Sequence, residues 1–260
     1  MAVELAGGCR VSAMREGIPH VAGTLSIWNR IGKATGSQAI SLRVLEFGVG
    51  LSPGLRNGDC DEVLYVLEDL DHPEKTKRCT VFIDGQPHRV QTQTGIYLRP
   101  GQTLMADNPG PETICFVSSQ CPESSSNGIV PLTSADLLGD SQRDETAVVR
   151  LSDQREMPTG DRWYRVLVDH QIGSEQVTQF VGSIPPGRAP DHFHEYEEVL
   201  FILRGTGRMW TVDVNTPIGP GSCVYLPRGQ VHCVENTGDG ELRLLGVFYP
   251  AGSPAVRYDT

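Results

Sequence analysis

The chain has 260 residues, of which 38% are apolar, and it contains no run of about 18 apolar residues that would span a membrane as a helix. Its net charge is −10, with 32 acidic against 22 basic residues and no stripe of Lys and Arg. A nucleic-acid backbone or an anionic membrane would therefore be repelled overall. A small molecule bound in a local pocket stays compatible with this charge.

The N-terminus and the cysteines both point to the cytoplasm. Charged residues interrupt the first segment before an apolar signal-peptide core can form. The seven cysteines are odd in number, scattered and free of CxxC spacing. This usage favours reduced thiols over a disulfide framework or a zinc ribbon.

Short apolar segments recur along the chain between turn-forming residues. They are rich in Val, Ile, Leu, Tyr and Phe, and long helical periodicity is almost absent. This pattern predicts an all-β architecture. The clearest predicted strands are 41–47, 62–67, 79–83, 114–118, 163–169, 177–184, 198–203, 208–212 and 242–248.

The two halves of the chain repeat one pattern. In the first half, DEVLYVL at 61–67 is followed by IYLRPG at 96–101. In the second half, EEVLFIL at 197–203 is followed by VYLPRG at 224–229. The first copy is longer, and the charged stretch 69–78 is the expected place for a longer hairpin.

A polar segment rich in Ser, Pro, Asn and Asp lies between the copies, at 122–145. We interpret it as a connector. The domain prediction is an N-terminal extension or strand at 1–35, a first β-barrel at 36–121 and a second β-barrel at 146–260. The two barrels are expected to pack against each other.

The second half carries a group of residues with metal-ligand chemistry. In an extended segment His192 and His194 point to the same face. Glu198 keeps that parity if the extension continues, whereas a turn through 195–197 would deliver it from the adjacent strand. His232 follows a Pro and a Gly that begin another strand. Three imidazoles and one carboxylate suit one divalent ion such as Fe, Mn, Ni, Co or Zn, with open positions for a substrate.

The spacing of these residues resembles the two motifs of the cupin superfamily. The first motif, G(x)5HxH(x)3-4E(x)6G, is matched by His192, His194, Glu198 and Gly205, with Gly187 one residue nearer than usual. The second, G(x)5PxG(x)2H(x)3N, is matched by Gly221, Pro227, Gly229, His232 and Asn236. The resemblance implies a double-stranded β-helix, or jelly-roll, barrel with the four ligands pointing inward. Together with the internal repeat it implies a bicupin.

Glu197 is the alternative carboxylate ligand because it neighbours Glu198. The spacing to Gly205 and the alternation with Leu200 and Ile202 favour Glu198. Glu198 is also the candidate catalytic residue, as a proton acceptor.

The first half lacks the three imidazoles. When Glu62 is aligned with Glu198, Arg56 and Gly58 stand opposite the first two histidines. Leu104 stands opposite the third. We expect this barrel to be structural, a dimer-like partner of the second. In the alternative reading, Arg56 and Glu62 bind a polar ligand without metal.

Four further residues lie near the motifs or in polar strands. His88 follows the Asp84-Gly85 turn and is predicted to face solvent. Cys233 neighbours a predicted ligand, but strand alternation turns it away, so a packed thiol is expected. Arg188 and Asp191 either orient a charged substrate at the pocket mouth or belong to an ordinary solvated loop.

The cupin resemblance implies an enzyme acting on a small organic molecule. The first hypothesis is a mononuclear metal-dependent oxidoreductase, a dioxygenase that uses O2 on an enol, diketone or diol-type substrate. The second is a non-oxidative metal-dependent isomerase, lyase or hydrolase of a small carboxylate or sugar acid. The third is a non-catalytic cupin that binds a small molecule. No nucleic-acid or membrane partner is expected, and assembly into a homodimer is left open.

Overall fold

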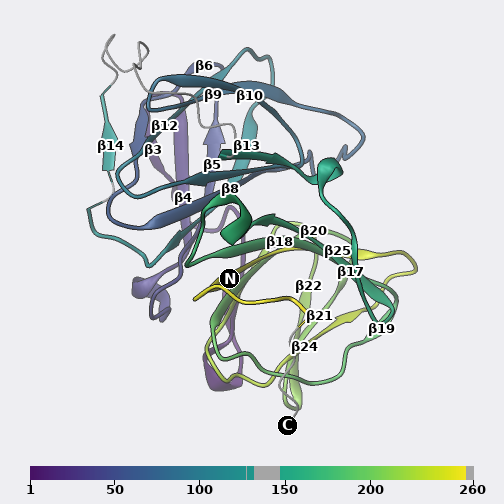
Figure 1. Cartoon of the computed structure of the whole chain (residues 1–260). Helices are drawn as coiled ribbons and strands as arrows, with labels where there is room; N and C mark the ends of the chain where they lie inside the picture. The colour runs from purple at the N-terminus through teal and green to yellow at the C-terminus, as the bar shows by residue number, and fades with distance from the viewer. Residues whose placement is uncertain (127, 132–146, 256–260) are drawn as a thin grey trace.

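The computed structural model describes residues 1–126, 128–131 and 147–255, and within these ranges it is built almost entirely of β-strands (Figure 1). The helical elements in this part of the chain are short 3-10 turns, η1 (Ala6–Gly8), η2 (Lys33–Thr35), η5 (Leu151–Asp153) and η6 (His170–Ile172). None of them is long and apolar enough to cross a membrane. The all-β prediction is confirmed, and each predicted strand corresponds to an observed one. The predicted connector at 122–145 lies largely outside the described residues.

The first barrel consists of two facing sheets. Its strands are β3 (His20–Ala22), β4 (Leu25–Ile31), β5 (Leu42–Phe47), β6 (Gly50–Leu51), β7 (Gly54–Arg56), β8 (Asp61–Val66), β9 (Arg78–Ile83), β10 (Gln86–Gln91), β11 (Thr94–Leu98), β12 (Thr103–Asn108), β13 (Ile114–Cys121), β14 (Gly128–Val130) and β15 (Val148–Arg150). One sheet has the order β15-β11-β8-β13-β5-β4-β3. The other has the order β10-β9-β12-β7-β14, with β6 paired to β12.

The second barrel repeats this arrangement. Its strands are β1 (Val3–Glu4), β2 (Arg10–Ala13), β16 (Met157–Thr159), β17 (Arg162–Val168), β18 (Thr178–Ile184), β19 (Gly187–Arg188), β20 (Glu197–Arg204), β21 (Gly207–Thr211), β22 (Val214–Ile218), β23 (Ser222–Leu226), β24 (Cys233–Asn236) and β25 (Leu242–Tyr249). The larger sheet has the order β1-β2-β23-β20-β25-β18-β17-β16, and the smaller one β19-β24-β21-β22.

The two halves exchange strands. The N-terminal strand β2, purple in Figure 1, pairs with β23 of the second barrel, with Val11 opposite Val224. In return β15 pairs with β11 of the first barrel, with Val149 opposite Gly95. The domain ranges given above stay a prediction, and this exchange shows that each large sheet is completed by a strand from the other half of the chain.

The longer hairpin of the first barrel is present as predicted. β8 and β9 are joined by residues 67–77, whereas Gly205 and Thr206 alone join β20 and β21. Gly205 has φ 83°, and a Cβ there would lie 2.7 Å from the Glu241 carbonyl oxygen. The tight turn of the second barrel therefore requires glycine at this position.

Strand β20 is buried on both faces and separates two cores. Leu200 and Ile202 point into the second barrel, whereas Val199 and Phe201 join an apolar cluster shared by both barrels. A strand covered on both sides reads as a continuous apolar run, as this one does. The interior of the first barrel forms a separate cluster.

A polar contact ties β20 to the first barrel. The Glu197 carboxylate accepts the backbone N–H groups of residues 38–40, at 2.8 to 3.1 Å, and the hydroxyl of Tyr225. On the other side of the pseudo-symmetric interface, Tyr97 donates its hydroxyl to Asp61 at 2.6 Å. Tyr97 also donates to the carbonyl of Gly173 in the second half of the chain, at 3.4 Å, so the Glu197 and Tyr97 contacts across the interface fix the relative position of the barrels together with apolar packing.

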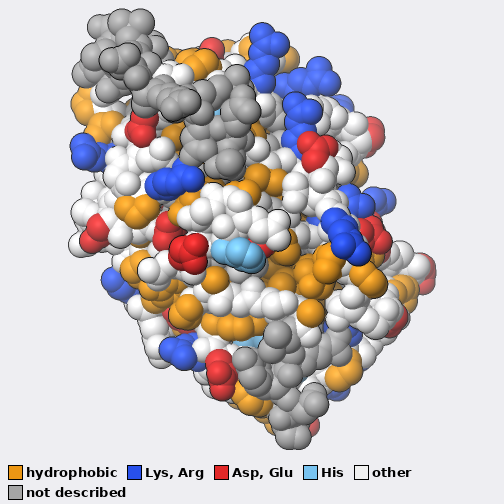
Figure 2. Space-filling model, in the orientation of Figure 1, with side chains coloured by type: hydrophobic (Ala, Val, Ile, Leu, Met, Phe, Trp, Pro, Cys, Tyr) orange, Lys and Arg blue, Asp and Glu red, His pale blue; other side chains and the backbone are white. Residues whose placement is uncertain are grey.

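The outer surface carries mixed charge. On the face shown in Figure 2, acidic and basic side chains are scattered, and several cationic side chains gather at the upper right, over the first barrel. No single-sign stripe crosses this view.

Candidate metal centre

The centre lies inside the second barrel, where two segments approach each other just before β20 and β24. His192 and His232 form an isolated antiparallel bridge, in which each backbone N–H donates to the carbonyl of the other, at 3.0 and 2.8 Å. The carbonyl of His194 accepts the N–H of Gly229 at 2.8 Å. Backbone pairing thus holds the three histidines before any ligand binds.

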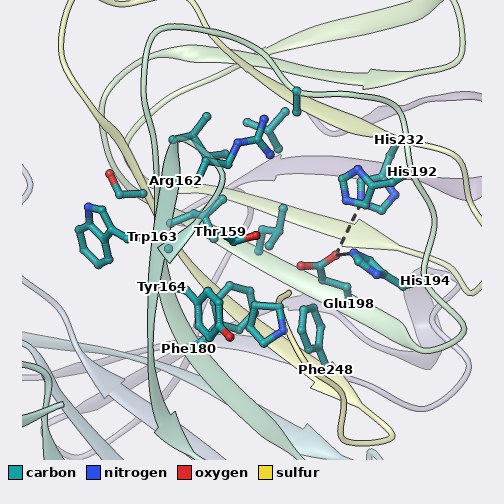
Figure 3. Close-up of a pocket in the computed structure, with 18 residues that line it drawn as sticks. Thr159, Arg162, Trp163, Tyr164, Phe180, His192, His194, Glu198, His232 and Phe248 are labelled. Atoms are coloured by element: carbon teal, nitrogen blue, oxygen red, sulfur yellow. Dashed lines mark ion pairs between the residues drawn. The ribbon is translucent and has the colours of Figure 1, made fainter. Parts of the chain in front are cut away.

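All four predicted side chains converge (Figure 3). The candidate ligand nitrogens of His192, His194 and His232 all lie within 4.8 Å of one another. Glu198 Oε2 lies 3.6 Å from Nε2 of His194 and 3.7 Å from Nε2 of His232. Because β20 turns Glu197 toward the other barrel, Glu198 is the carboxylate that faces the imidazoles.

Backbone carbonyls orient two of the rings. Nδ1 of His192 lies 3.1 Å from the Pro190 carbonyl, and Nδ1 of His232 lies 2.8 Å from that of Gln230. An Nδ1–H that donates to a carbonyl leaves Nε2 with its lone pair, the form that ligates metals. The third ring, that of His194, stacks on Tyr196 with centroids 4.8 Å apart.

Burial sets the protonation of the cluster. Desolvation lowers the pKa of His194 and of His232 to about 3, so both imidazoles are neutral at neutral pH. Desolvation also raises the pKa of Glu198 to about 8. A buried carboxyl group beside three imidazoles, of which His194 and His232 are neutral, is a donor set that a divalent cation would complete. The residues therefore fit a mononuclear metal.

A cavity of about 100 Å³ opens beside these four side chains. Phe180, Leu200 and Phe248 form an apolar part of its wall. Arg162 of β17 lines the same cavity, and Figure 3 shows its guanidinium extending on the side of the histidines. The sequence motifs did not indicate Arg162, because β17 is brought to the site only by its pairing with β18.

Arg188 and Asp191 are not among the residues that line this cavity. The Arg188 guanidinium lies 4.2 Å over the ring of Trp210 and donates to Asp191 at 3.2 Å. It also donates to Cys233 Sγ at 3.2 Å. Cys233 is fully buried, and burial raises the pKa of its thiol to about 11, as a packed thiol requires. The prediction for Cys233 is confirmed.

The prediction that His88 faces solvent is wrong. His88 is only 3% exposed, and it pairs with the buried Val81 across the β9–β10 hairpin. Asp84 and Gly85, with φ 47° and 78°, form a two-residue turn that fixes this register. Because directly paired residues share one face of a sheet, His88 must point inward with Val81.

The first barrel has leucines where the second has a histidine pair. Leu55 of β7 pairs with Leu104 of β12 at the position where His192 pairs with His232. The predicted alignment of Leu104 with His232 therefore holds. The alignment of Arg56 with His192 was one residue off, because an extra residue precedes the carboxylate in the first copy.

Glu62, the equivalent carboxylate of the first barrel, forms an ion pair with an arginine. Arg43 Nη2 donates to Glu62 Oε1 at 2.5 Å. Ser118 and Gln120 donate to the same carboxylate at 2.6 and 3.1 Å. Sequence alignment by motif did not find Arg43, since it lies outside the repeated segments.

Comparisons with known proteins agree with this architecture. Residues 180–248 match the family model described as Cupin domain. The oxalate-binding protein of Thermotoga maritima is 36% identical over 67 residues, covering 25% of this chain and 55% of that protein. Auxin-binding protein 1 of Arabidopsis thaliana is 29% identical over 86 residues, covering 29% of this chain and 43% of that protein. The matches thus span about half the length of these curated relatives.

Solved structures extend the likeness to both barrels. Oxalate decarboxylase of Bacillus subtilis superposes with a TM-score of 0.69 at 13% identity, covering 92% of this chain and 75% of the other. A protein of Pseudomonas aeruginosa described as glyoxylate-induced gives a TM-score of 0.72 at 16% identity, covering 97% and 93%. Residues 180–248 of this chain thus match a cupin domain, and both halves of the chain share the fold of the solved structures. Its fold is that of a bicupin, with two cupin barrels in one chain.

Proposed function

We propose that the second barrel is the site of a metal-dependent enzyme in which His192, His194, Glu198 and His232 hold one divalent transition-metal ion. The observation that carries this proposal is the convergence of three imidazoles on a buried carboxyl group inside a cavity. Candidate ions are Fe, Mn, Ni, Co and Zn, since this donor set accepts most of the first-row series.

The substrate we propose is a small carboxylate. Arg162 gives the cavity a guanidinium, which recognises a carboxylate by paired hydrogen bonds. The modest volume, about 100 Å³, suits a compact molecule. The relatives named above include a protein that binds oxalate, which supports the same substrate class.

The reaction class that we place first is non-oxidative, a lyase, isomerase or hydrolase step on that acid. A bound divalent metal would act as a Lewis acid toward an oxygen of the substrate. Arg162 would orient the substrate carboxylate, and Phe180 and Phe248 would exclude water. Glu198 is the residue that would accept a proton, because its carboxyl group lines the cavity beside the imidazoles.

An anaerobic assay tests this proposal. Metal-loaded protein would be incubated without O2 with a panel of small hydroxy, keto and dicarboxylic acids, and substrate loss would be followed by NMR. Arg162→Gln is expected to raise KM at least tenfold, because a charge-assisted contact to the substrate is lost. Turnover that is equally fast in Arg162→Gln would show that Arg162 does not bind the carboxylate of the substrate.

An O2-dependent dioxygenase is the second candidate function. The apolar wall formed by Phe180, Leu200 and Phe248 is the observation that favours it, since such a wall accepts the carbon skeleton of an enol, diketone or diol. Oxygen uptake with such substrates, together with no turnover of them under the anaerobic conditions above, would establish this reaction. Ligand binding without turnover in either assay would identify a non-catalytic binding protein.

We place the protein in the cytoplasm, where its thiols would stay reduced. None of the seven cysteines, all of which lie within the described residues, forms a disulfide, and six of them are buried. The expected partner is a small molecule, and a homodimer is compatible with the fold.

A further inference from the structure

The first barrel keeps a cavity of its own, of about 250 Å³. Leu55 and Glu62 line it, at the positions that His192 and Glu198 occupy beside the metal cavity. The cavity is therefore the counterpart of the candidate metal site, with different chemistry at its floor.

The guanidinium of Arg43 is fixed at this floor. Its Nη2 bonds Glu62 at 2.5 Å and Ser118 at 3.0 Å, and its Nε bonds Ser118 at 3.3 Å. The Arg43 side chain is 12% exposed and lines the cavity. Within the described residues, Nη1 of Arg43 has no hydrogen-bond partner. Because the rest of the guanidinium is held in place, this N–H group is already oriented to donate to a ligand.

The charge of the cavity favours an anion. Arg43 and Arg56 contribute two positive charges, and Glu62 contributes one negative charge. Arg56 is exposed on β7, at the rim, and Asn29 and His20 add polar groups. A net positive cavity in a chain of net charge −10 is a local reversal of sign. Such a reversal concentrates anions at the site.

We propose that the first barrel binds a small carboxylate on Arg43 and Arg56, without metal. A planar guanidinium matches a carboxylate in geometry as well as in charge. In this barrel Arg43 supplies the cation that a metal ion would supply in the other. The proposal stands independently of any reaction in the second barrel.

Calorimetric titration of the full-length chain tests the proposal. The protein would be stripped of metal with EDTA, then titrated with malonate, with uncharged malonamide as the ligand control. Three variants are compared. Arg43→Lys keeps a positive charge beside Glu62 but loses the planar fork, Arg56→Gln removes the rim charge, and Arg162→Gln is the matched control in the second cavity.

Arg162→Gln is expected to retain the malonate site of the first barrel with the wild-type affinity while losing any malonate binding in the second cavity, and malonamide should bind neither protein. Arg56→Gln and Arg43→Lys should each weaken binding at least tenfold, as expected for a lost charge-assisted hydrogen bond. Thermal melts establish which variants are folded. If Arg43→Lys does not fold, the exposed Arg56→Gln decides. Absence of malonate binding in wild type, or binding lost only in Arg162→Gln, overturns the proposal.

Discussion

Each barrel has a buried glutamate at the equivalent position of its large sheet, and the two barrels surround it with different side chains. Glu62 of the first barrel accepts hydrogen bonds from Arg43, Ser118 and Gln120. In the second barrel the strand register gives the equivalent places around Glu198 to Phe180, Gly246 and Phe248. The charge of Glu62 is thus balanced by Arg43, whereas Glu198 lies in an apolar wall without an arginine partner among the described residues.

The residues opposite the carboxylates differ in a complementary way. Where the first barrel pairs Leu55 with Leu104, the second pairs His192 with His232. In the first barrel, the carboxylate that is paired with Arg43 lies beside two leucines. In the second barrel, the carboxyl group in the apolar wall lies beside two histidines. A buried carboxylate is stabilised by a cation, which Arg43 supplies in the first barrel and which a bound metal would supply in the second.

The largest expected effect is the loss of metal from His232→Ala. Altering a residue that merely supports a ligand lowers metal affinity roughly 10- to 100-fold, so removal of a ligand itself should cost about 100-fold or more. Elemental analysis of purified protein should find about one equivalent in wild type and almost none in the variant. Leu104→Ala, the matched change in the first barrel, should leave metal content unchanged. A full equivalent in His232→Ala would refute the ligand assignment.

Removal of the Arg43 side chain from the first barrel should lower the stability of the fold rather than its metal content. Arg43→Ala leaves Glu62 buried without its ion pair, and the expected loss in free energy of unfolding is about 3–5 kcal/mol. Urea denaturation measures this loss. The double variant Arg43→Met with Glu62→Met is the control, and it should recover most of the stability. A loss below about 1 kcal/mol in Arg43→Ala would show that the pair is not needed.

Glu197 and Glu198 should separate structure from metal binding. Glu197→Ala removes the acceptor for three backbone N–H groups of the first barrel, so we expect about 3 kcal/mol of destabilisation with metal content retained. Glu198→Ala should instead lose the metal while the metal-free protein stays folded. Denaturation and elemental analysis of both variants provide the test, and an exchange of the two phenotypes would reverse the assignment.

The smallest expected effect is the change in stability of the metal-free protein between pH 6.5 and pH 8. Burial raises the pKa of Glu198 from 4.5 to about 8, so ionisation is disfavoured in the folded state. Stability is then greatest below the unfolded pKa and falls as pH rises toward 8, by up to about 1.4 kcal/mol per unit. His194 and His232 have lowered pKa values, so they cost stability only as pH falls below 6.5.

The window from pH 6.5 to 8 isolates the Glu198 effect from that of these two histidines. Urea denaturation of EDTA-treated protein should show declining stability there, and Glu198→Gln should remove the decline. Equal slopes in wild type and variant would show that the carboxylate is already ionised without metal.

Much of the fold and of the site was predictable because the signals are local. Alternation of apolar residues indicated the strands, and the HxH spacing with Glu198 and His232 indicated the four converging side chains. Alternation also separated Glu198 from Glu197. His88 was misplaced because its face depends on the register of a hairpin rather than on its own neighbours.

The amino-acid sequence was enough to predict an all-β bicupin and a cluster of four particular residues in its second half. Strand periodicity and motif spacing are properties of short segments, so they can be read without coordinates. The three-dimensional arrangement was needed to show that Arg162 joins the site, that Arg43 neutralises Glu62 and that Glu197 secures the barrel interface. Each of these three contacts joins strands or loops distant in sequence, and they are brought together by sheet pairing or, for Glu197, by the packing of one barrel on the other.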